Sequence, residues 1–575
     1  MPPTDPAGRA RRVPATPAPD TPRPATPAPA TPRPATPAPA TPAPATPRPA
    51  TPAPATPAPD RPITGTPASA APATPAPGRP IPGGSASAAP GRPITGTPAS
   101  AAPATSAPPT PAARPGVVDL AVVGAGPAGL AAAVTAAGLG LEVALLDAAE
   151  RPGGQIHRHP APGLGAAPRA VRRLTRGVRG VTHLPGHHVW TVVRDGDTDT
   201  WLLHAVAGPE EAPATVRARA VLLSTGAYER QLPFPGWTLP GVVGAGGAQA
   251  MLKGGLALPG AGAFPARPEP GARRRIVVAG SGPLLLAVAT TLAAAGARVP
   301  ALVEAADYTA YARHVPVLAR NPAKLVQGAL HGGALLGRGT RLLTRHAVTA
   351  AHGTTRVEAV TVARLDADWR PVPGTGRRVP CDALAVGHGL VPQLELATAL
   401  GCATRRTPDG TPALEVDAEQ RTSVPGVWAA GETCGVGGAE LAAAEGEIAA
   451  HSVAGARTAA VLRQKRRRDR LRAFADAMAA AHRPGPGWTD WLDGTTEVCR
   501  CEEVTADEIR TAVTDLGARD ARTVKLLTRA GMGWCQGRTC GQAVARLAGG
   551  DPAPDRRPLS CPVPLSRLAQ PPGAE

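Results

Sequence analysis

The chain has 575 residues, enough for several domains, with a formal charge of +18 and eight cysteines. No stretch reaches 18 consecutive apolar residues, which argues against a transmembrane helix. Residues 1–115 are Pro/Ala/Thr repeats that hold about half of the 72 prolines, so the whole chain cannot form one packed core. We expect a disordered tail there, because such repeats cannot offset the entropy of ordering. A spacer, a ligand for a proline-recognising partner and a stretch ahead of the true translation start are the alternatives.

The charge is scattered apart from the run KRRRDR at 465–470. This run would suit phosphates, but neither interleaved aromatic residues nor a nucleic-acid motif accompanies it. We interpret it as a solvated helix face and expect no nucleic-acid partner. Arg11 and Arg12 form a pair without the apolar region that an export signal needs, so we expect a cytoplasmic protein. Thiols stay reduced there, and the cysteines are expected to be core residues, metal ligands or redox groups.

A first nucleotide-binding motif follows the tail. The apolar run 117–123 has the length and β-branched content of a buried parallel strand and leads into Gly124-x-Gly126-x-x-Gly129. Gly124 permits the tight turn, Gly126 lets the backbone approach a pyrophosphate, and Gly129 lets the following helix pack closely. The helix N-terminus then faces the phosphates. The turn residues assigned to the dinucleotide are Gly124, Gly126, Pro127, Ala128 and Gly129.

An acid ends the next predicted strand at the spacing that a ribose contact needs. The strand 141–147 ends at Asp147, eighteen residues past Gly129. A carboxylate there accepts a hydrogen bond from a ribose 2′-OH and repels a 2′-phosphate. The site therefore favours FAD or NAD over NADP.

Three later stretches resemble those of the two-dinucleotide-domain flavoproteins, whose Rossmann folds are glutathione-reductase-like, and they occur in that family's order. They are RPGGQ at 151–155, VLLSTGAYER at 221–230 and TSVPGVWAAGE at 422–432. The resemblance implies FAD. It places Arg151, Gly153, Gly154 and Gln155 near the diphosphate, Thr225 and Gly226 in the turn that ends the first half, and Gly431 and Glu432 at the ribityl chain. The family usually has Asp where this chain has Glu432.

Residues 272–304 repeat the pattern of strand, glycine turn, helix and strand, with Gly280 and Gly282 in the turn and Glu304 at the end. The resemblance implies that this inserted domain binds NAD(P)H, and Glu304 would favour NAD. Leu285 replaces the third glycine and is expected to push the helix outward. A structural domain or an altered nucleotide site is therefore the alternative.

A disulfide reductase of this fold would need a redox cysteine pair beside the flavin. Cys381, Cys402 and Cys434 stand alone in the sequence, and we expect them to be small buried hydrophobic residues. The sequence therefore predicts the fold without the redox disulfide.

Four cysteines near the C-terminus form two pairs, Cys499-x-Cys501 and Cys535-x4-Cys540, around a predicted helical hairpin that opens with a capping box of Thr505 and Glu508. Four converging thiolates suit zinc or an iron–sulfur cluster, and both spacings depart from the CxxC of zinc ribbons. The spacing resembles the BFD-like domain of bacterioferritin-associated ferredoxin. The stretch GMGWCQGRTCG at 531–541 resembles the alpha subunits of hydrogen cyanide synthase, opine oxidases, hydroxyproline dehydrogenase and sarcosine oxidase. This implies that Cys499, Cys501, Cys535 and Cys540 hold a 2Fe-2S cluster, with zinc or a vestigial site as alternatives.

We therefore expect an α/β flavoprotein with two Rossmann folds and a small helical C-terminal domain. The expected segments are a disordered tail (1–115), a FAD-binding domain in two parts (116–270 and 376–459), an inserted NAD(P)-binding-like domain (271–375), a helical linker (460–494), a BFD-like cluster domain (495–550) and a C-terminal tail (551–575).

The resemblance implies an FAD-dependent electron-transfer alpha subunit that acts on CH-NH bonds of amino or imino acids of the D-hydroxyproline, opine, glycine or sarcosine type. The expected partners are a D-amino-acid-oxidase-like FAD beta subunit, which would oxidise the substrate, and a small ferredoxin-like subunit. No amine-oxidising base is evident, because His157, His159 and His388 are each more typical of structural histidines. Two alternatives are a self-sufficient NAD(P)H-dependent FAD/2Fe-2S reductase and a flavin-binding assembly module with an iron-sensing cluster.

Overall fold

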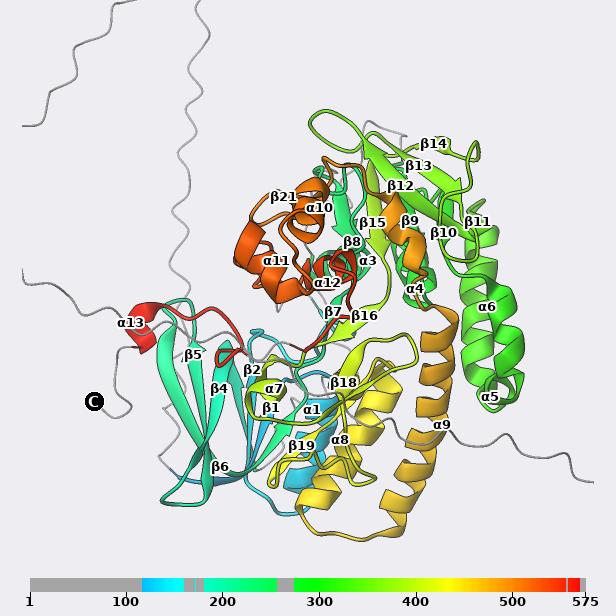
Figure 1. The fold of residues 1–575 in the computed structure, drawn as a ribbon. Helices are drawn as coiled ribbons and strands as arrows, with labels where there is room; N and C mark the ends of the chain where they lie inside the picture. The colour runs from blue at the N-terminus through cyan, green and yellow to red at the C-terminus, as the bar shows by residue number, and fades with distance from the viewer. Residues whose placement is uncertain (1–115, 160–170, 172–179, 256–272, 555–556, 569–575) are drawn as a thin grey trace, which may run out of the picture. The chain divides into compact units, whose positions relative to one another are not determined.

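The computed structural model describes residues 116–159, 171, 180–255, 273–554 and 557–568. The tail predicted for residues 1–115 lies outside the described residues. The described part contains two parallel-sheet domains, a connecting ribbon and a small helical domain (Figure 1). Among the described helices, none combines the length and apolarity needed to cross a membrane.

The first domain is built on a seven-stranded sheet in the order β3-β2-β1-β6-β5-β4, with β19 beside β6. The strands are β1 (Val118–Val123), β2 (Val143–Asp147), β3 (Val181–Pro185), β4 (His187–Asp195), β5 (Thr200–Ala207), β6 (Ala212–Leu223) and β19 (Val427–Ala429). Side chains alternate between the faces of β1, so Leu120 and Val122 pack under α1 (Pro127–Gly138) and α8 (Ala439–Val453). Ala121 and Val123 face the other way, into the cluster that includes Leu203 of β5.

The second domain has a five-stranded parallel sheet in the order β11-β10-β9-β15-β8. Its strands are β8 (Val242–Gly244), β9 (Ile276–Gly280), β10 (Ala301–Glu304), β11 (Arg341–Thr344) and β15 (Ala383–Gly387). One face carries α3 (Ala245–Gly254) and α4 (Leu284–Ala294), and α6 (Pro322–Leu336) packs against α4. The other face packs against an antiparallel sheet of β12 (His346–His352), β13 (Ala359–Arg364) and β14 (Arg377–Pro380).

Leu285, the residue in place of the third glycine, is accommodated by a later and tighter helix start. Helix α4 begins at Leu284, and its first turn closes with a bond from Leu285 N to Gly282 O of 3.1 Å. In the first fold, by contrast, Leu130 N reaches back four residues to Gly126 O. The Leu285 side chain is buried among Ile276, Val278 and the rest of that core cluster.

Two connections join the parallel-sheet domains. A two-stranded ribbon pairs β7 (Ala227–Glu229) with β16 (Leu390–Pro392), and α7 (Glu395–Ala399) follows it. The long helix α9 (Ala459–Ala481) runs from α8 to η1 (Tyr308–His314) and α5 (Val315–Ala319) of the second domain (Figure 1).

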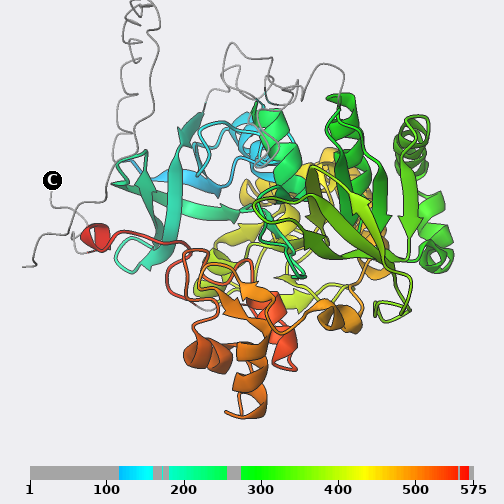
Figure 2. The ribbon, with the colours of Figure 1, turned by 90° about the horizontal axis from the view of Figure 1, so that it is seen from above.

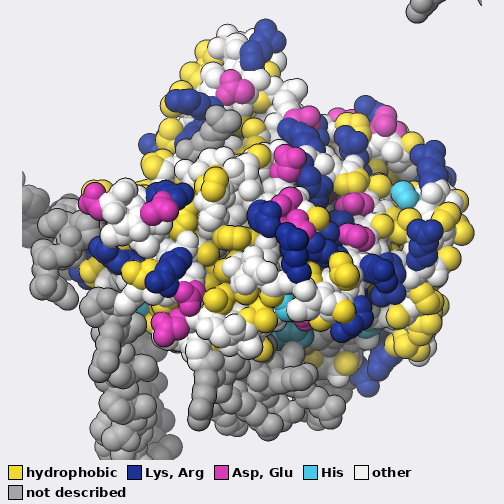
Figure 3. Space-filling view, turned by 90° about the horizontal axis from the view of Figure 1, so that it is seen from below, with side chains coloured by type: hydrophobic (Ala, Val, Ile, Leu, Met, Phe, Trp, Pro, Cys, Tyr) yellow, Lys and Arg dark blue, Asp and Glu magenta, His cyan; other side chains and the backbone are white. Residues whose placement is uncertain are grey.

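The basic run on α9 is largely paired with nearby acceptors. Lys465 forms an ion pair with Glu419, Arg467 lies 4.0 Å from Glu440, and Arg468 bonds Asp469. Figure 3 shows basic and acidic side chains interspersed on the lower face of the molecule. Arg468 and Lys465 are mostly shielded by their contacts with Gln420 and Glu419, so this part of the run packs against the first domain rather than forming a fully solvated helix face.

The small domain consists of β20 (Glu497–Cys499), β21 (Val504–Thr505), α10 (Ala506–Thr514), α11 (Ala521–Thr528) and α12 (Gly541–Leu547). The predicted capping box of Thr505 and Glu508 opens α10. The domain projects from the body (Figure 2), but its core continues into the second domain through Trp369 and Trp491. Trp491 lies in η3 (Pro486–Trp491), and its Nε1 donates to Trp369 O at 2.8 Å.

The chain then returns from the small domain to the first domain. Residues 557–568, which the sequence analysis placed in a C-terminal tail, pass β4 and end in α13 (Leu565–Leu568) (Figure 1). Ser560 N donates to Trp190 O and Ser560 Oγ to Val189 O, both at 2.9 Å. A bulge interrupts the pairing of β4 with β5 at this point, between Val189 and Thr191. We call residues 557–562 the C-terminal strap.

Candidate functional site

The first glycine turn forms an open cradle at the end of β1. Gly124 has φ +105°, which favours glycine, and a Cβ on Gly129 would collide with the carbonyl oxygen of Gly124. Gly126 is the N-cap of α1, and a Cβ there would meet nothing within 4 Å. The backbone therefore faces open space where the helix N-terminus could bind a pyrophosphate.

Asp147 lies beside this cradle at the end of β2. Its carboxylate accepts from Ala125 N and from Ala149 N at 2.7 Å. The buried Nε2 of His183, on the neighbouring strand, has no hydrogen-bond partner. Burial lowers the pKa of His183, while the charge of Asp147 opposes this effect. A buried polar atom without a partner beside Asp147 fits an adenine dinucleotide, and nothing in the sequence had indicated His183.

The segment 151–155 packs onto the same turn. Gly153 N donates to Ala125 O at 2.8 Å, and a Cβ on Gly154 would lie 3.0 Å from Gly126 Cα. Arg151 is held by a bond to His159 O at 2.9 Å, and Gln155 is exposed. The structure therefore brings Gly153 and Gly154 together with the glycine turn, whereas Arg151 is bonded within its own segment and Gln155 points to solvent.

Thr225 and Gly226 follow the end of β6, next to the end of β1. Thr225 Oγ1 donates to Gln393 O, and Gln393 N donates to Gly226 O, both at 2.9 Å. This turn, which we call the flavin turn, is thereby fixed to the ribbon of β7 and β16.

Glu432 is folded back onto the start of α8. Its carboxylate accepts from Gly437 N at 3.2 Å and from Gly438 N at 2.9 Å. Burial raises the pKa of Glu432, and the two amides oppose that rise. A ribityl hydroxyl would therefore share this carboxylate with the helix N-terminus.

Glu445 supports the Gly431 turn and was missed by the sequence analysis. It accepts from Gly431 N at 2.9 Å, and its side chain is 2% exposed. Arg472 of α9 pairs with it at 2.6 Å and also donates to Gly435 O at 2.7 Å. This pair fixes the turn that carries Gly431 and Glu432.

The second glycine turn differs from the first because its acid is engaged by the chain itself. Glu304 is 2% exposed and accepts from Gly282 N at 3.1 Å and Ala306 N at 3.0 Å. His482, just past the end of α9, places Nδ1 3.5 Å from Glu304. Burial raises the pKa of Glu304, but the bond and charge of His482 and the two amides outweigh burial, so the pKa is lowered.

Further polar groups complete this network. Nδ1 of His482 also lies 3.1 Å from Ser281 Oγ, and its Nε2 lies 2.6 Å from the hydroxyl of Tyr311. The rings of Tyr308 and Tyr311 contact the imidazole edge-to-face, with centroids 6.5 and 5.8 Å from it. The structure thus brings Gly280, Gly282 and Glu304 together. His482, however, occupies the place beside Glu304 where the ribose of a bound nucleotide would have to lie.

The histidines that the sequence analysis considered as possible bases, among them His159 and His388, make contacts typical of structural residues. His159 Nδ1 contacts His157 O at 3.1 Å. His388 packs against the rings of Trp369 and Trp491, which stack on each other with centroids 6.3 Å apart, and burial lowers its pKa to about 4. It is therefore neutral near pH 7.

The four C-terminal cysteines lie as two interacting pairs. Cys540 hydrogen-bonds to Cys499 and thereby lowers the pKa of Cys499 to about 5, while Cys501 interacts with Cys535. Gly531 N also points to Cys499 Sγ at 3.4 Å. Within the described ranges, no three His, Cys, Asp or Glu residues are grouped so that they could hold one metal ion. Two pairs, each with one cysteine from each motif, suit the two irons of a 2Fe-2S cluster better than a single zinc.

Backbone geometry closes the loop between Cys535 and Cys540. Gln536 and Gly537 have φ values of +52° and +80°, and a Cβ on Gly533 would collide with Cys501 Cβ. Gly541 is the first residue of α12 and has no positive φ.

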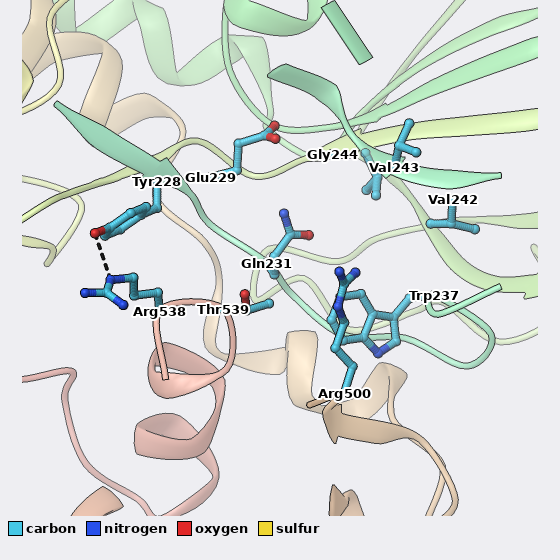
Figure 4. A pocket seen from close by; sticks show the side chains of 11 residues that line it. Tyr228, Glu229, Gln231, Trp237, Val242, Val243, Gly244, Arg500, Arg538 and Thr539 are labelled. Atoms are coloured by element: carbon cyan, nitrogen blue, oxygen red, sulfur yellow. Dashed lines mark hydrogen bonds between the residues drawn. The ribbon is translucent and has the colours of Figure 1, made fainter. Parts of the chain in front are cut away.

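A cavity of about 290 Å³ lies between the ribbon, β8 and the cysteine loops (Figure 4). Glu229 lines it and caps α3 by accepting from Gly246 N at 2.6 Å and Gly247 N at 3.0 Å. Burial raises the pKa of Glu229. The other lining residues are Tyr228, Gln231, Trp237, Val242, Val243, Gly244, Val386, Arg500, Arg538 and Thr539.

Family models match both parts of this arrangement. Residues 118–456 match the pyridine nucleotide-disulphide oxidoreductase model, and residues 497–548 match the BFD-like [2Fe-2S] binding domain. The chain belongs to the pyridine nucleotide-disulphide oxidoreductase family. Within this family it is an FAD oxidoreductase with an added 2Fe-2S domain, which confirms the predicted fold class and resemblance. Cys381, Cys402 and Cys434 are buried and unpaired, as expected without a redox disulfide.

Several known proteins are similar over most of the chain. Hydrogen cyanide synthase subunit HcnB of Pseudomonas aeruginosa is 35% identical over 436 residues, which cover 73% of this chain and 90% of that protein. An opine oxidase subunit of Rhizobium meliloti is 32% identical over 483 residues, which cover 79% of this chain and 85% of that protein. The crystal structure of L-proline dehydrogenase from P. horikoshii shares the fold, with a TM-score of 0.54 and 19% identity over 79% of this chain and 80% of that one.

Proposed function

We propose that this chain is the electron-transfer alpha subunit of a heteromeric dehydrogenase or oxidase that acts on the CH-NH bond of an amino or imino acid. The observation that carries this proposal is the packing of the four-cysteine domain against the ribbon that fixes the flavin turn. Bound FAD would supply two-electron chemistry and the cluster one-electron transfer. The similar proteins from Pseudomonas aeruginosa and Rhizobium meliloti are both named as subunits, which supports a heteromeric assembly.

The residues of the first fold have binding roles in this proposal. Gly124, Gly126 and Gly129 present the N-terminus of α1 to the diphosphate, and Asp147 accepts from the ribose. Arg151, Gly153, Gly154 and Gln155 cover the diphosphate, and Thr225, Gly226, Gly431 and Glu432 serve the ribityl end. Cys499 and Cys540 hold one iron, and Cys501 and Cys535 hold the other.

Oxidation of the carbon–nitrogen bond is assigned to the partner, a D-amino-acid-oxidase-like FAD beta subunit. Among the described residues near the flavin turn, two titratable groups already have structural roles: Glu229 caps α3, and His388 packs against the rings of Trp369 and Trp491. A small ferredoxin-like subunit would be a further partner. The substrate would be an amino or imino acid of the D-hydroxyproline, opine, glycine or sarcosine type.

The alternative of an NAD(P)H-dependent reductase fits the second fold less well. Glu304 would have to give up its contact with His482 before it could accept from an NAD ribose. We therefore propose that the second fold has a structural role and that electrons come from the partner subunit.

Purification and co-expression test the proposed function. We expect the isolated chain to contain flavin, iron and acid-labile sulfide and to reduce dyes poorly with amino acids. Co-expression with a D-amino-acid-oxidase-like protein encoded beside it should give substrate-dependent dye reduction. A chain that carries zinc without iron, or that oxidises amino acids alone, would overturn the proposal.

A further inference from the structure

Arg538 connects the cysteine loop to the body of the protein. It lies between Cys535 and Cys540, and only 15% of its side chain is exposed. Its Nε donates to the hydroxyl of Tyr228 at 2.8 Å and to Glu395 Oε1 at 2.9 Å (Figure 4 shows the Tyr228 bond). Its remaining nitrogens donate to Cys535 O at 3.4 Å, Gln536 Oε1 at 3.2 Å and Ser560 O.

Of the two body residues that Arg538 contacts, Tyr228 lies on β7, one arm of the ribbon, and Glu395 opens α7, the helix that follows the other arm, β16. Tyr228 is two residues beyond Gly226, and it pairs with Val391 of β16. Glu395 is two residues beyond Gln393, the residue that bonds both Thr225 and Gly226. One guanidinium therefore holds β7, the arm that follows the flavin turn, together with the start of α7, the helix that follows the other arm.

The same guanidinium holds the C-terminal strap. The carbonyl of Ser560 accepts from Arg538, while Ser560 N and Oγ bond the backbone of β4. Arg538 thus joins the cysteine loop, the ribbon and the strap at one point.

The chemistry of this junction requires arginine. The planar guanidinium donates in several directions at once and keeps its charge, whereas a lysine ammonium is a compact point charge. Burial and the charge of Glu395 raise the pKa of Tyr228, so its phenol stays neutral and can accept. Arg538 reaches the backbone carbonyl of Cys535, one of the proposed cluster ligands, and Glu395 at 2.9 Å offsets part of its charge. The positive charge that remains favours the reduced, more negative cluster and so raises its reduction potential.

We propose that Arg538 is a positioning residue that fixes the cluster loop against the flavin turn and raises the reduction potential of the cluster. The second half of this inference rests on the proposed function, because it requires a bound cluster. The first half concerns contacts within the chain and can be tested separately.

Two substitutions separate geometry from charge. Arg538→Gln removes both the branched donor set and the charge, whereas Arg538→Lys keeps the charge alone. Arg529→Gln is the matched control, because Arg529 belongs to the same small domain but pairs with Glu502 and is 71% exposed. Tyr228→Phe removes one acceptor without touching the loop.

Hydrogen exchange and a redox titration of the full chain provide the readouts. We expect amide exchange in 535–541 and 557–562 to accelerate by about tenfold or more in both Arg538 variants, since charge-assisted bonds are lost. The acceleration should be smaller in Tyr228→Phe. The cluster potential should fall in Arg538→Gln and stay near the wild-type value in Arg538→Lys, with Arg529→Gln unchanged in both measurements.

The possible contrary results are distinct. If Arg538→Gln and Arg529→Gln behave alike in exchange and potential, Arg538 has no positioning role. If the reduction potential of the cluster falls equally in Arg538→Lys and Arg538→Gln, the positive charge of Arg538 does not contribute to that potential. A wild-type chain without iron would overturn the proposed function, and the exchange measurement would still decide the mechanical role. Should Arg538→Gln fail to fold, the Lys and Tyr228→Phe variants carry the test.

Discussion

At the scale of single residues, the ion pair of Glu445 and Arg472 supports the proposed flavin site without belonging to a motif. We expect Glu445→Gln to destabilise the first domain by about 3–5 kcal/mol, because it leaves a largely buried guanidinium without its partner. Flavin content should fall with it, since glutamine has one accepting oxygen where Glu445 uses two, one for Gly431 N and one for Arg472. Urea denaturation followed by flavin and tryptophan fluorescence measures both effects. The control is Glu440→Gln, which removes an exposed carboxylate from the same helix and should shift the midpoint little.

Gly129 provides a second test at this scale. In Gly129→Ala the new Cβ would collide with the carbonyl of Gly124, so the turn that receives the diphosphate must open. We expect purified Gly129→Ala to lose most of its flavin. Gly138→Ala adds the same methyl group to the last residue of the same helix, where nothing lies within 4 Å. The measurement is the ratio of flavin to protein in each purified variant. Equal ratios in Gly129→Ala and Gly138→Ala would contradict the assignment of this glycine turn to the diphosphate.

His388 predicts a dependence of stability on acid. Burial holds its pKa at about 4, below the ordinary value of 6.5, with Arg230 adding to the effect and Glu304 opposing it. The unfolded chain therefore binds a proton here more readily than the folded chain, and stability is lost as the pH falls from 6.5 towards 4. The loss is on the order of 3 kcal/mol for this one group. Denaturation midpoints across this range should show a shallower loss in His388→Gln than in wild type, and parallel curves would contradict the prediction.

At the scale of elements, the C-terminal strap closes the contact between the small domain and the first domain. We expect a chain ending at residue 554 to keep its flavin but to show faster exchange and faster proteolysis in 497–548, because Arg538 and β4 both lose Ser560 as a partner. A chain ending at residue 568 retains the strap and serves as the control. Equal protection in the two truncations would mean that the strap does not restrain the domain.

At the scale of the whole molecule, the network around His482 determines where electrons can enter. We expect NADH neither to bind tightly to the isolated chain nor to bleach its flavin quickly, because Glu304 is engaged by His482. His482→Ala should improve NADH binding if the imidazole of His482 is the only group that keeps Glu304 from a nucleotide at the second glycine turn. Calorimetry and anaerobic spectra provide the measurements. Rapid bleaching of the wild-type flavin by NADH would favour the reductase alternative.

The sequence predicted the parts of this molecule that depend on neighbouring residues. The glycine turns, Asp147 and the capping box at Thr505 each rest on a short spacing, and the family matches confirmed the fold that they indicated. The residues that complete the sites are joined to partners far along the chain, so no periodicity reveals them. His482 meets Glu304, and Arg538 meets Tyr228, only after several domains have folded. The missed residues are His183, Glu445, Arg472, His482, Arg538 and Ser560.

The chain enters the small domain beside Trp491, which is bonded to Trp369, and leaves it through Ser560, which is bonded to β4. Both ends of the domain are therefore tethered at separate places. Between these ends the domain shares its hydrophobic core with Leu365 and Trp369 of the second domain, so a swing of the domain about the line between its ends would also have to open that core. If the cysteine loops ever turn outward to meet a partner, release of Arg538 from Tyr228 and Glu395 is the first step of that swing.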